Sequence, residues 1–469
     1  MGRRHGFELA IWYRPAMLPS TTRALVHLAW PVFVGQLAVM GYGLVDTLMA
    51  GHLSPADLAA VGVGSSIFYS VFVALMGVLI ALSPVVARLH GAGETAAIGE
   101  QVRQSAWLAL FLALPCGLLL VFPEPFLALS RLQPVVETKV RAFLFWQACG
   151  VPALLLFRVP YGWSTAVSLP RPMMVFQVLG LLIKLPLNVW FMYGGLGVAA
   201  QGGAGCAMAS AVTAWVVLGL TLWWVRREAA YRPYGVFERW SWPDPKLIAR
   251  QLKLGLPIGA TFLVDVTAYT FMALFIARLG PDVSAAHQVA ANLGALCFML
   301  PASLGHAAAV LVGQALGAGE ARQARVTGFV AIAMGLAAAL PVCGALWFGR
   351  AWIAGFYVTD GKVAAIAAGL ISLVACYHFF DALQAVAVNV LRGYHRTVMP
   401  MLIYATALWG LGLGGGYVLG LTNLLGPLPA GLVPPLGAPG FWLAAIGSLG
   451  VAGGLVTVYL ERVSRCRVQ

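Results

Sequence analysis

The chain has 469 residues, of which 61% are hydrophobic and only 10% are charged. Average soluble domains carry roughly a quarter charged residues, so this composition excludes an ordinary water-soluble globular protein and favours a membrane protein. The formal net charge is +13, but no solvated domain gathers basic and aromatic residues, so nucleic acid is not an expected partner.

The first 23 residues contain a short apolar stretch interrupted by Glu8, Arg14 and Pro15. Without a longer apolar core and a small-residue cleavage site, this segment is predicted to be a cytoplasmic tail and not a signal peptide. Twelve apolar runs follow, each suited in length to a transmembrane helix. They cover 25–50, 59–83, 105–122, 142–163, 174–194, 203–225, 255–278, 286–312, 327–348, 364–391, 400–421 and 439–460. An all-α integral membrane protein is therefore expected, since barrel strands would alternate in hydrophobicity.

Lys and Arg residues are concentrated in the segments that lie on the same side of the membrane as the N-terminus. Cytoplasmic segments carry such an excess. We therefore expect a multi-pass protein of the plasma (inner) membrane with both termini in the cytoplasm.

An internal repeat relates the two halves of the sequence at a constant offset of 226 residues. Pro31 matches Pro257, Pro55 matches Pro281, and the tetrapeptide at 91–94 matches that at 317–320. Because each copy holds six runs, both copies enter the membrane from the same side, as parallel repeats around a central cavity. The predicted divisions are a tail at 1–23, an N-terminal lobe at 24–225, a basic cytoplasmic linker at 226–254, a C-terminal lobe at 255–460 and a cytoplasmic tail at 461–469.

Three acidic residues fall inside the apolar runs: Asp46, Asp265 and Asp381. An ionisable group near the bilayer centre costs at least ~2.5–3.5 kcal/mol, so such residues usually serve a function. The repeat aligns Asp46 with Met272 and Asp265 with Val39. The acids are thus not duplicated with the scaffold, which favours chemistry specific to each lobe. The alternative is that each acid lies at a helix end or in a structural hydrogen bond.

Polar residues at helical spacing accompany the acids. Tyr377, Asp381 and Gln384 share one helix face, as do Asp265 and Tyr269. Gln288 and Asn292 form a similar pair in the next run. Such a set can replace water around a small cation or hold a proton, although aromatic and polar stripes also occur as packing.

At these residues the sequence resembles a known family. The stretch PVFVGQLAVMGYGLVDTLMAGHLSPADLAAVGVGSSIFYSV, with AAHQVAANLGALCFMLPASLG and DALQAVAVNVLRGY in the second half, resembles multidrug and toxic compound extrusion (MATE) transporters of the NorM type. The resemblance implies a secondary antiporter that exports small cationic amphipathic compounds while sodium ions or protons enter. It implies that the coupling ion binds at Asp265, Asp381, Tyr377 and Asn292, with the two acids as possible ligands of a sodium ion. It also implies that Asp46 occupies the position of the family's acidic residue in the first helix.

Two positions depart from the family pattern. The seventh-helix acid is typically Glu, whereas Asp265 is one methylene shorter, which makes sodium coordination less assured than proton exchange. Lys184 replaces an amide one turn before Asn188. Lys184 is either a snorkelling side chain near the cytoplasmic end or an internal partner of Asp46. With Tyr42, one turn before Asp46, these residues form a predicted substrate or proton site in the N-terminal lobe.

Other functional classes find less support. The sequence contains neither a phosphate-binding GxxxxGK[ST] loop nor an HExxH motif. We therefore expect no enzyme and no cofactor besides Na⁺ or H⁺ as the coupling ion. The expected partners are the cationic cargo and membrane lipid, and the expected state is a monomer. The alternative function is a lipid-linked oligosaccharide flippase, which should have a strongly cationic central cavity.

Overall fold

The structure is a computed structural model that describes residues 18–130, 132–195, 197–422 and 436–468. The first half contains α1 (Leu18–Leu53), α2 (Pro55–Ile80), α3 (Leu82–Gly91), α4 (Thr95–Val121), α5 (Glu124–Ser130), α6 (Pro134–Ala166), α7 (Arg171–Tyr193), α8 (Ala204–Arg227) and the 3₁₀ helix η2 (Ala229–Tyr234). The second half contains α9 (Pro245–Ala277), α10 (Pro281–Gly317), α11 (Ala321–Tyr357), α12 (Gly361–Gly393), α13 (Val398–Ala405), the π-helix η3 (Thr406–Gly414), α14 (Gly415–Leu421) and α15 (Ala438–Val468).

The twelve predicted transmembrane segments are confirmed, because twelve helices of the described residues are long and apolar enough to cross a membrane. Helices α2 and α3 together form one span, and α13, η3 and α14 form another. Several helices extend beyond the apolar runs. Helix α9 begins at Pro245, inside the predicted linker, where the Asp244 side chain accepts a hydrogen bond from the backbone of Lys246. Capping at this polar end lets the helix start well before its apolar part.

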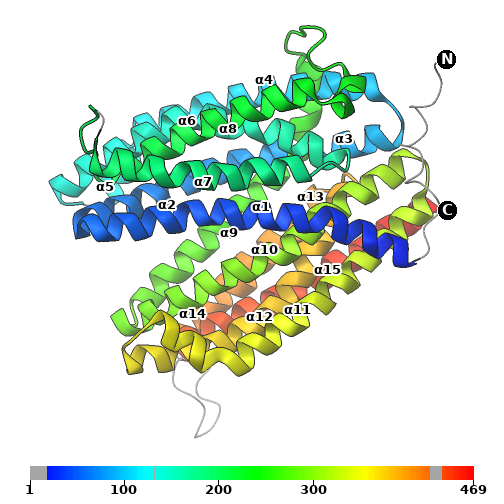
Figure 1. Cartoon of the computed structure of the whole chain (residues 1–469). Helices are drawn as coiled ribbons and strands as arrows, with labels where there is room; N and C mark the ends of the chain where they lie inside the picture. The colour runs from blue at the N-terminus through cyan, green and yellow to red at the C-terminus, as the bar shows by residue number, and fades with distance from the viewer. Residues whose placement is uncertain (1–17, 131, 196, 423–435, 469) are drawn as a thin grey trace, which may run out of the picture.

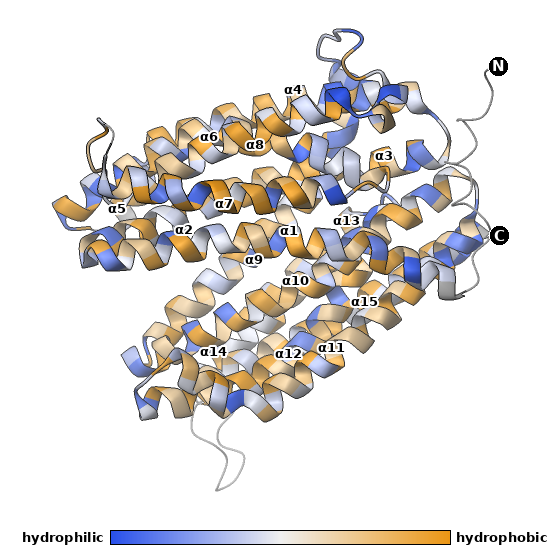
Figure 2. Cartoon of the chain, in the orientation of Figure 1, coloured by the Kyte–Doolittle hydropathy of each residue, from blue (hydrophilic) through white to orange (hydrophobic). Residues whose placement is uncertain are grey.

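The helices form two bundles that lie side by side, α1 to α8 in one and α9 to α15 in the other (Figure 1). Helix α1 begins and α15 ends at the same side of the molecule. Hydrophobic residues cover the middle lengths of the helices, and hydrophilic residues gather mainly at the side where α1 begins (Figure 2). The repeated prolines occupy equivalent places, since Pro55 begins α2 and Pro281 begins α10. The expected pair of parallel six-helix repeats is therefore confirmed.

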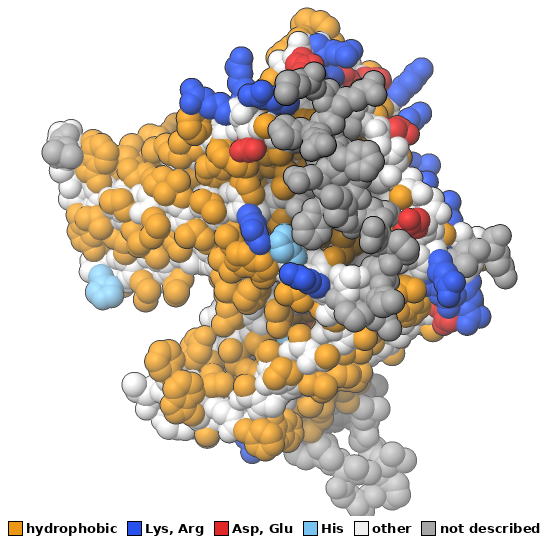
Figure 3. Space-filling view, turned by 45° about the vertical axis from the view of Figure 1, so that its right-hand side comes forward, with side chains coloured by type: hydrophobic (Ala, Val, Ile, Leu, Met, Phe, Trp, Pro, Cys, Tyr) orange, Lys and Arg blue, Asp and Glu red, His pale blue; other side chains and the backbone are white. Residues whose placement is uncertain are grey.

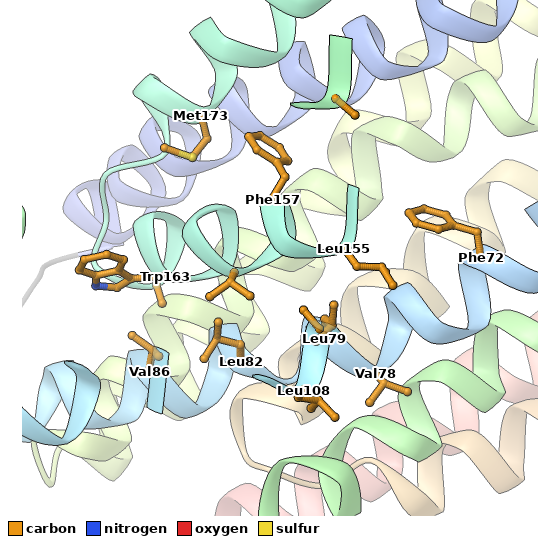
Figure 4. Packing of buried hydrophobic residues seen from close by; sticks show 14 of the residues in the cluster. Phe72, Val78, Leu79, Leu82, Val86, Leu108, Leu155, Phe157, Trp163 and Met173 are labelled. Atoms are coloured by element: carbon orange, nitrogen blue, oxygen red, sulfur yellow. The ribbon is translucent and has the colours of Figure 1, made fainter. Parts of the chain in front are cut away.

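The hydrophobic core is continuous between the bundles only on one side. One cluster of buried residues includes Phe72, Leu82 and Trp163 of the first bundle (Figure 4) and extends to Val312 of α10 and Val390 of α12. A separate cluster fills the rest of the second bundle. On the side opposite the start of α1 the two bundles diverge around an open hollow (Figure 3). The bundles are thus joined near the chain ends and separated at the far side.

Glycines permit a close contact between the bundles where they are joined. A Cβ atom on Gly91, the last residue of α3, would overlap the carbonyl oxygen of Gln314 in α10. A Cβ atom on Gly317 would likewise overlap the carbonyl oxygen of Arg88. Gly91 and Gly317 are equivalent in the repeat, so the contact has approximate two-fold symmetry. The Gln314 side chain also donates hydrogen bonds across the seam to the Ala166 carbonyl at 2.7 Å and to Ser168 Oγ at 3.0 Å.

We predict that Gly91→Ala destabilises the protein, because the added methyl group meets backbone atoms of α10. Overpacking of this kind costs about 1–3 kcal/mol. The measurement is the thermal unfolding midpoint of the purified protein in detergent. The matched control is Gly117→Ala in α4, since a Cβ there meets no atom within 4 Å. Equal midpoints for Gly91→Ala and the wild type would show that the close packing at this contact is unimportant.

Candidate functional site

An ion pair lies inside the first bundle, between α1 and α7. Lys184 Nζ lies 2.8 Å from Asp46 Oδ2, and Asn188 Nδ2 donates to Asp46 Oδ1, also at 2.8 Å. Lys184 is only 1% exposed, and the other two residues are also buried. The one-turn spacing of Lys184 and Asn188 on α7 directs both donors to the same carboxylate. Both oxygens of Asp46 therefore have a partner within the protein.

Neighbouring side chains hold this pair in place. Lys184 also donates to Ser210 Oγ on α8, whose own hydroxyl donates to the Cys206 carbonyl at 2.9 Å. The ammonium lies 5.5 Å from the ring centroid of Tyr42, and the Tyr42 hydroxyl donates to the Gln177 carbonyl at 3.1 Å. The four predicted residues of this lobe, Asp46, Tyr42, Lys184 and Asn188, thus form one connected group, and Ser210 is an addition that the sequence pattern did not reveal.

These contacts decide between the alternatives for Lys184 and Asp46. A snorkelling lysine would place its ammonium at the membrane surface, but this side chain is almost completely buried against a carboxylate. Asp46 does not lie at a helix end, because it is buried within α1. The charge contact expected from the sequence is present. Its role in binding a substrate or a proton stays a prediction.

The second bundle holds two polar contacts on the inner parts of α9, α12 and α13. The hydroxyl of Tyr404 donates to Asp265 Oδ1. The hydroxyls of Tyr269 and Tyr377 lie 2.5 Å apart in a hydrogen bond. Tyr404 was not expected from the sequence, because its helix lies far from Asp265 along the chain and carries no acidic residue to attract attention. Only the tertiary structure shows that the Tyr404 hydroxyl donates a hydrogen bond to this carboxylate.

Asp381 differs from the other two acids. It is buried, yet it has no hydrogen bond or ion pair with any described side chain, and it interacts electrostatically with Asp265. Tyr377 and Gln384 are buried on the same helix, as the shared face predicts. Asn292 and Gln288, by contrast, are exposed on α10 and make no polar contact with this group. The structure therefore shows electrostatic contact among three of the four predicted coupling residues, whereas Asn292 forms no hydrogen bond with them.

A buried arginine lies near the acids of the second lobe. Arg392 directly follows the apolar run 364–391, yet it lies within α12 and is 6% exposed. Its guanidinium donates to Asn389 Oδ1 at 2.9 Å, lies 5.7 Å from the Phe262 ring centroid, and interacts electrostatically with Asp265. Hydropathy does not predict the depth of this residue, because α12 continues beyond the apolar residues that define the run.

The two lobes thus carry different chemistry on a shared scaffold. The N-terminal acid is neutralised by a lysine, whereas no Lys or Arg forms an ion pair with either C-terminal acid in the part of the chain described. Carboxyl and phenol groups can exchange protons, and their oxygens suit a hard cation such as sodium. No group of three or more His, Cys, Asp or Glu residues suited to a metal ion occurs among the described residues.

Comparison with known proteins places this arrangement in a family. The MatE family profile matches residues 31–190 and 257–418, one match for each repeat. The chain is 41% identical over 397 residues to the probable multidrug resistance protein NorM of Aromatoleum aromaticum, which covers 84% of this chain and 85% of that protein. It is 38% identical over 453 residues to the multidrug resistance protein PmpM of Pseudomonas aeruginosa, covering 96% and 94%.

Solved structures show the same fold at low sequence identity. The eukaryotic MATE transporter AtDTX14 aligns with a TM-score of 0.83 at 19% identity and covers 96% of this chain and 98% of its own. A multidrug resistance MATE transporter of the MOP superfamily in its outward-facing conformation aligns with a TM-score of 0.85 at 18% identity, covering 96% and 97%.

We predict that Lys184→Met strongly destabilises the protein, because it leaves Asp46 buried without its cation. Breaking a buried ion pair in this way costs about 3–5 kcal/mol. The double variant Asp46→Asn with Lys184→Met should recover much of this loss, as measured by thermal unfolding. The matched control is Lys362→Met, which breaks a 2.7 Å pair with Asp282 whose side chains are 76% and 41% exposed. Exposed pairs contribute only about 0–1 kcal/mol. Strict additivity of the two changes at Asp46 and Lys184 would contradict the coupling.

Proposed function

The chain belongs to the MatE family of membrane transporters, and we propose that it is an antiporter that exports small cationic amphipathic compounds in exchange for inward protons or sodium ions. As a member of this family it is a multi-pass membrane transporter and not an enzyme. Its relatives that are named multidrug resistance proteins support export of many compounds.

The observation that carries the proposal is the unequal charge pairing of the two lobes. Asp46 has a lysine partner 2.8 Å away, whereas Asp381 is buried with no bonded partner among the described side chains. A carboxyl group buried in this way gains most from a cation or a proton, because an isolated charge in a membrane is costly. We assign the coupling ion to Asp265 and Asp381, with Tyr377 and Tyr404 beside them.

The Asp46 group has a different part in this proposal. Its carboxylate binds a cationic cargo or a proton when Lys184 moves away, so the ion pair competes with the cargo for one site. Asn188 and Tyr42 remain as hydrogen-bonding and aromatic neighbours of the cargo. Aromatic faces attract organic cations, which fits this class of compound.

An ion gradient supplies enough energy for such export. One monovalent ion that moves down a potential of 100 mV supplies ~2.3 kcal/mol, which equals roughly a fiftyfold concentration ratio of a neutral cargo. We further propose that the protein resides in the plasma (inner) membrane with both termini in the cytoplasm. In that orientation the hollow between the bundles opens to the outside (Figure 3).

Everted membrane vesicles from cells without other efflux pumps test the proposal. A fluorescent cationic dye should accumulate in vesicles that contain the protein when the lumen is acidic or is loaded with sodium. Imposing the two gradients separately identifies the coupling ion. Accumulation that needs neither gradient, or none under either, would contradict antiport.

We predict that Asp265→Asn and Asp381→Asn each abolish gradient-driven dye accumulation. A neutral amide retains the size of the side chain but cannot exchange a proton or balance a sodium ion. Membrane insertion, measured by the amount and monodispersity of purified protein, should remain normal. The control is Glu124→Gln, which changes an exposed carboxylate paired with Arg141 and should keep full transport. Wild-type transport by either aspartate variant would refute the assignment.

We also predict that Tyr404→Phe lowers the transport rate without abolishing it. The substitution removes the hydroxyl that donates to Asp265 and leaves the ring in place. Hydrogen bonds to charged groups contribute about 1.5–3 kcal/mol, so a loss of roughly tenfold or more is expected. Initial rates of dye accumulation measure the effect. A Tyr404→Phe rate equal to that of the wild type would show that this hydrogen bond does not serve transport.

A further inference from the structure

A cavity lies between the two bundles, and its lining among the described residues includes no acidic side chain. It has a volume of about 190 Å³ and is bounded by α1 of the first bundle and by α10, α11 and α12 of the second. Its walls are almost entirely apolar, with Phe33, Leu300 and Met334 among the lining residues. An apolar cavity of roughly 150 Å³ is known to bind benzene. It accommodates one small organic molecule of one or two rings.

The cavity is lined by a buried histidine side chain without hydrogen-bond partners in the described part of the chain. His378, close to the middle of α12, is 1% exposed, and neither of its ring nitrogens has a hydrogen-bond partner among the described residues. The other polar lining residue, Ser303, donates its hydroxyl proton to the Met299 carbonyl at 2.6 Å. Buried polar groups in proteins are nearly always hydrogen-bonded, so we expect the imidazole to form a hydrogen bond with a molecule in the cavity.

One wall of the cavity lies at the lipid-facing surface. Val26 and Trp30 of α1 line the cavity and are 50% and 41% exposed. Both lie in the N-terminal part of α1, within the apolar span Ser20–Leu53, where exposed apolar side chains can contact lipid. A molecule dissolved in the bilayer can therefore reach the cavity between α1 and the second bundle without passing through the hollow.

The lining determines the chemical class of the occupant. Among the described residues no acidic side chain lines the cavity, so a cation would lose its hydration without a compensating charge. A lipid acyl chain fits the apolar walls but offers no hydrogen bond to His378, since lipid ester groups lie at the membrane surface. A neutral imidazole presents one donor and one acceptor, which a hydroxyl group satisfies.

We propose that this cavity is a binding site for small uncharged amphipathic molecules that enter from the membrane and hydrogen-bond to His378. His378 follows Tyr377 and lies three residues before Asp381, so the occupant rests on the helix that carries the proposed coupling residues. That the bound molecule is a transported cargo rests on the proposed function, whereas its binding to the cavity does not.

Equilibrium dialysis of radiolabelled 2-naphthol with the protein in lipid nanodiscs tests the site, after subtraction of the uptake by empty nanodiscs. The wild type should bind one molecule of 2-naphthol saturably. His378→Leu should weaken this binding by about two- to tenfold through loss of the hydrogen bond. Naphthalene, which lacks the hydroxyl, should bind the wild type and His378→Leu equally.

Two further variants fill the cavity from opposite walls: Ala338→Phe on α11 and Ala29→Phe on α1. Either one, if it purifies as a monodisperse protein, should abolish saturable binding. The matched control is His287→Leu, because His287 is also a buried histidine but packs against Trp442, with ring centroids 5.8 Å apart, and does not line the cavity. It should bind 2-naphthol as the wild type does.

Several results would overturn the proposal: no saturable binding to the wild type, unchanged binding in both filled variants, or a phospholipid that co-purifies with the wild type and is lost in Ala338→Phe. Dialysis needs no ion gradient, so its outcome is separate from that of the vesicle assay. Efflux without saturable 2-naphthol binding would refute only this inference, and binding without efflux would refute only the proposed function.

Discussion

The free-energy cost of placing a charge inside a membrane is the constraint on which the arrangement of polar residues in this protein depends. Water is absent there, so a buried carboxylate needs a partner from the protein, from the cargo or from the ion gradient. Asp46 finds a partner in Lys184, 2.8 Å away, and in Asn188. Asp381 finds none among the described side chains, and Asp265 has the hydroxyl of Tyr404. A chain that keeps unpaired acids in such surroundings bears an energetic cost, which is best understood if ions or protons visit them.

The duplicated scaffold makes the difference between the lobes meaningful. The repeat gives both halves the same helix order and the same prolines at the starts of α2 and α10. The charged residues break this symmetry, because the repeat places Met272 opposite Asp46 and Val39 opposite Asp265. Packing needs would have duplicated the polar residues with the helices. The charged residues that differ between the lobes underlie the proposal that one lobe binds an ion and the other a cargo.

The two lobes that carry these proposed sites meet at one seam. On the side of the chain ends, α3 and α10 approach each other closely at Gly91 and Gly317, and this brings the two bundles into close contact. On the opposite side the bundles diverge around the hollow (Figure 3). Backbone contacts at glycines involve few side chains to rearrange, so such a crossing is suited to rigid-body movement of one lobe against the other. The cavity beside His378 lies on the same seam, between α1 and α10.

The sequence by itself determined the twelve spans, the parallel repeats and the identity of the intramembrane acids. These follow from local properties: the length of apolar runs, the constant spacing of the repeat and the rarity of charges in lipid. The tertiary structure alone decided which groups meet. Tyr404 donates a hydrogen bond to Asp265, and Ser210 accepts one from Lys184, whereas Asn292 is exposed and bonds to neither acid. Spacing along the chain does not reveal these differences. Arg392 shows the limit most clearly, because hydropathy marks where an apolar run ends and not how deep the helix end is buried. Burial depends on the helices that pack against it, and these are distant in the sequence.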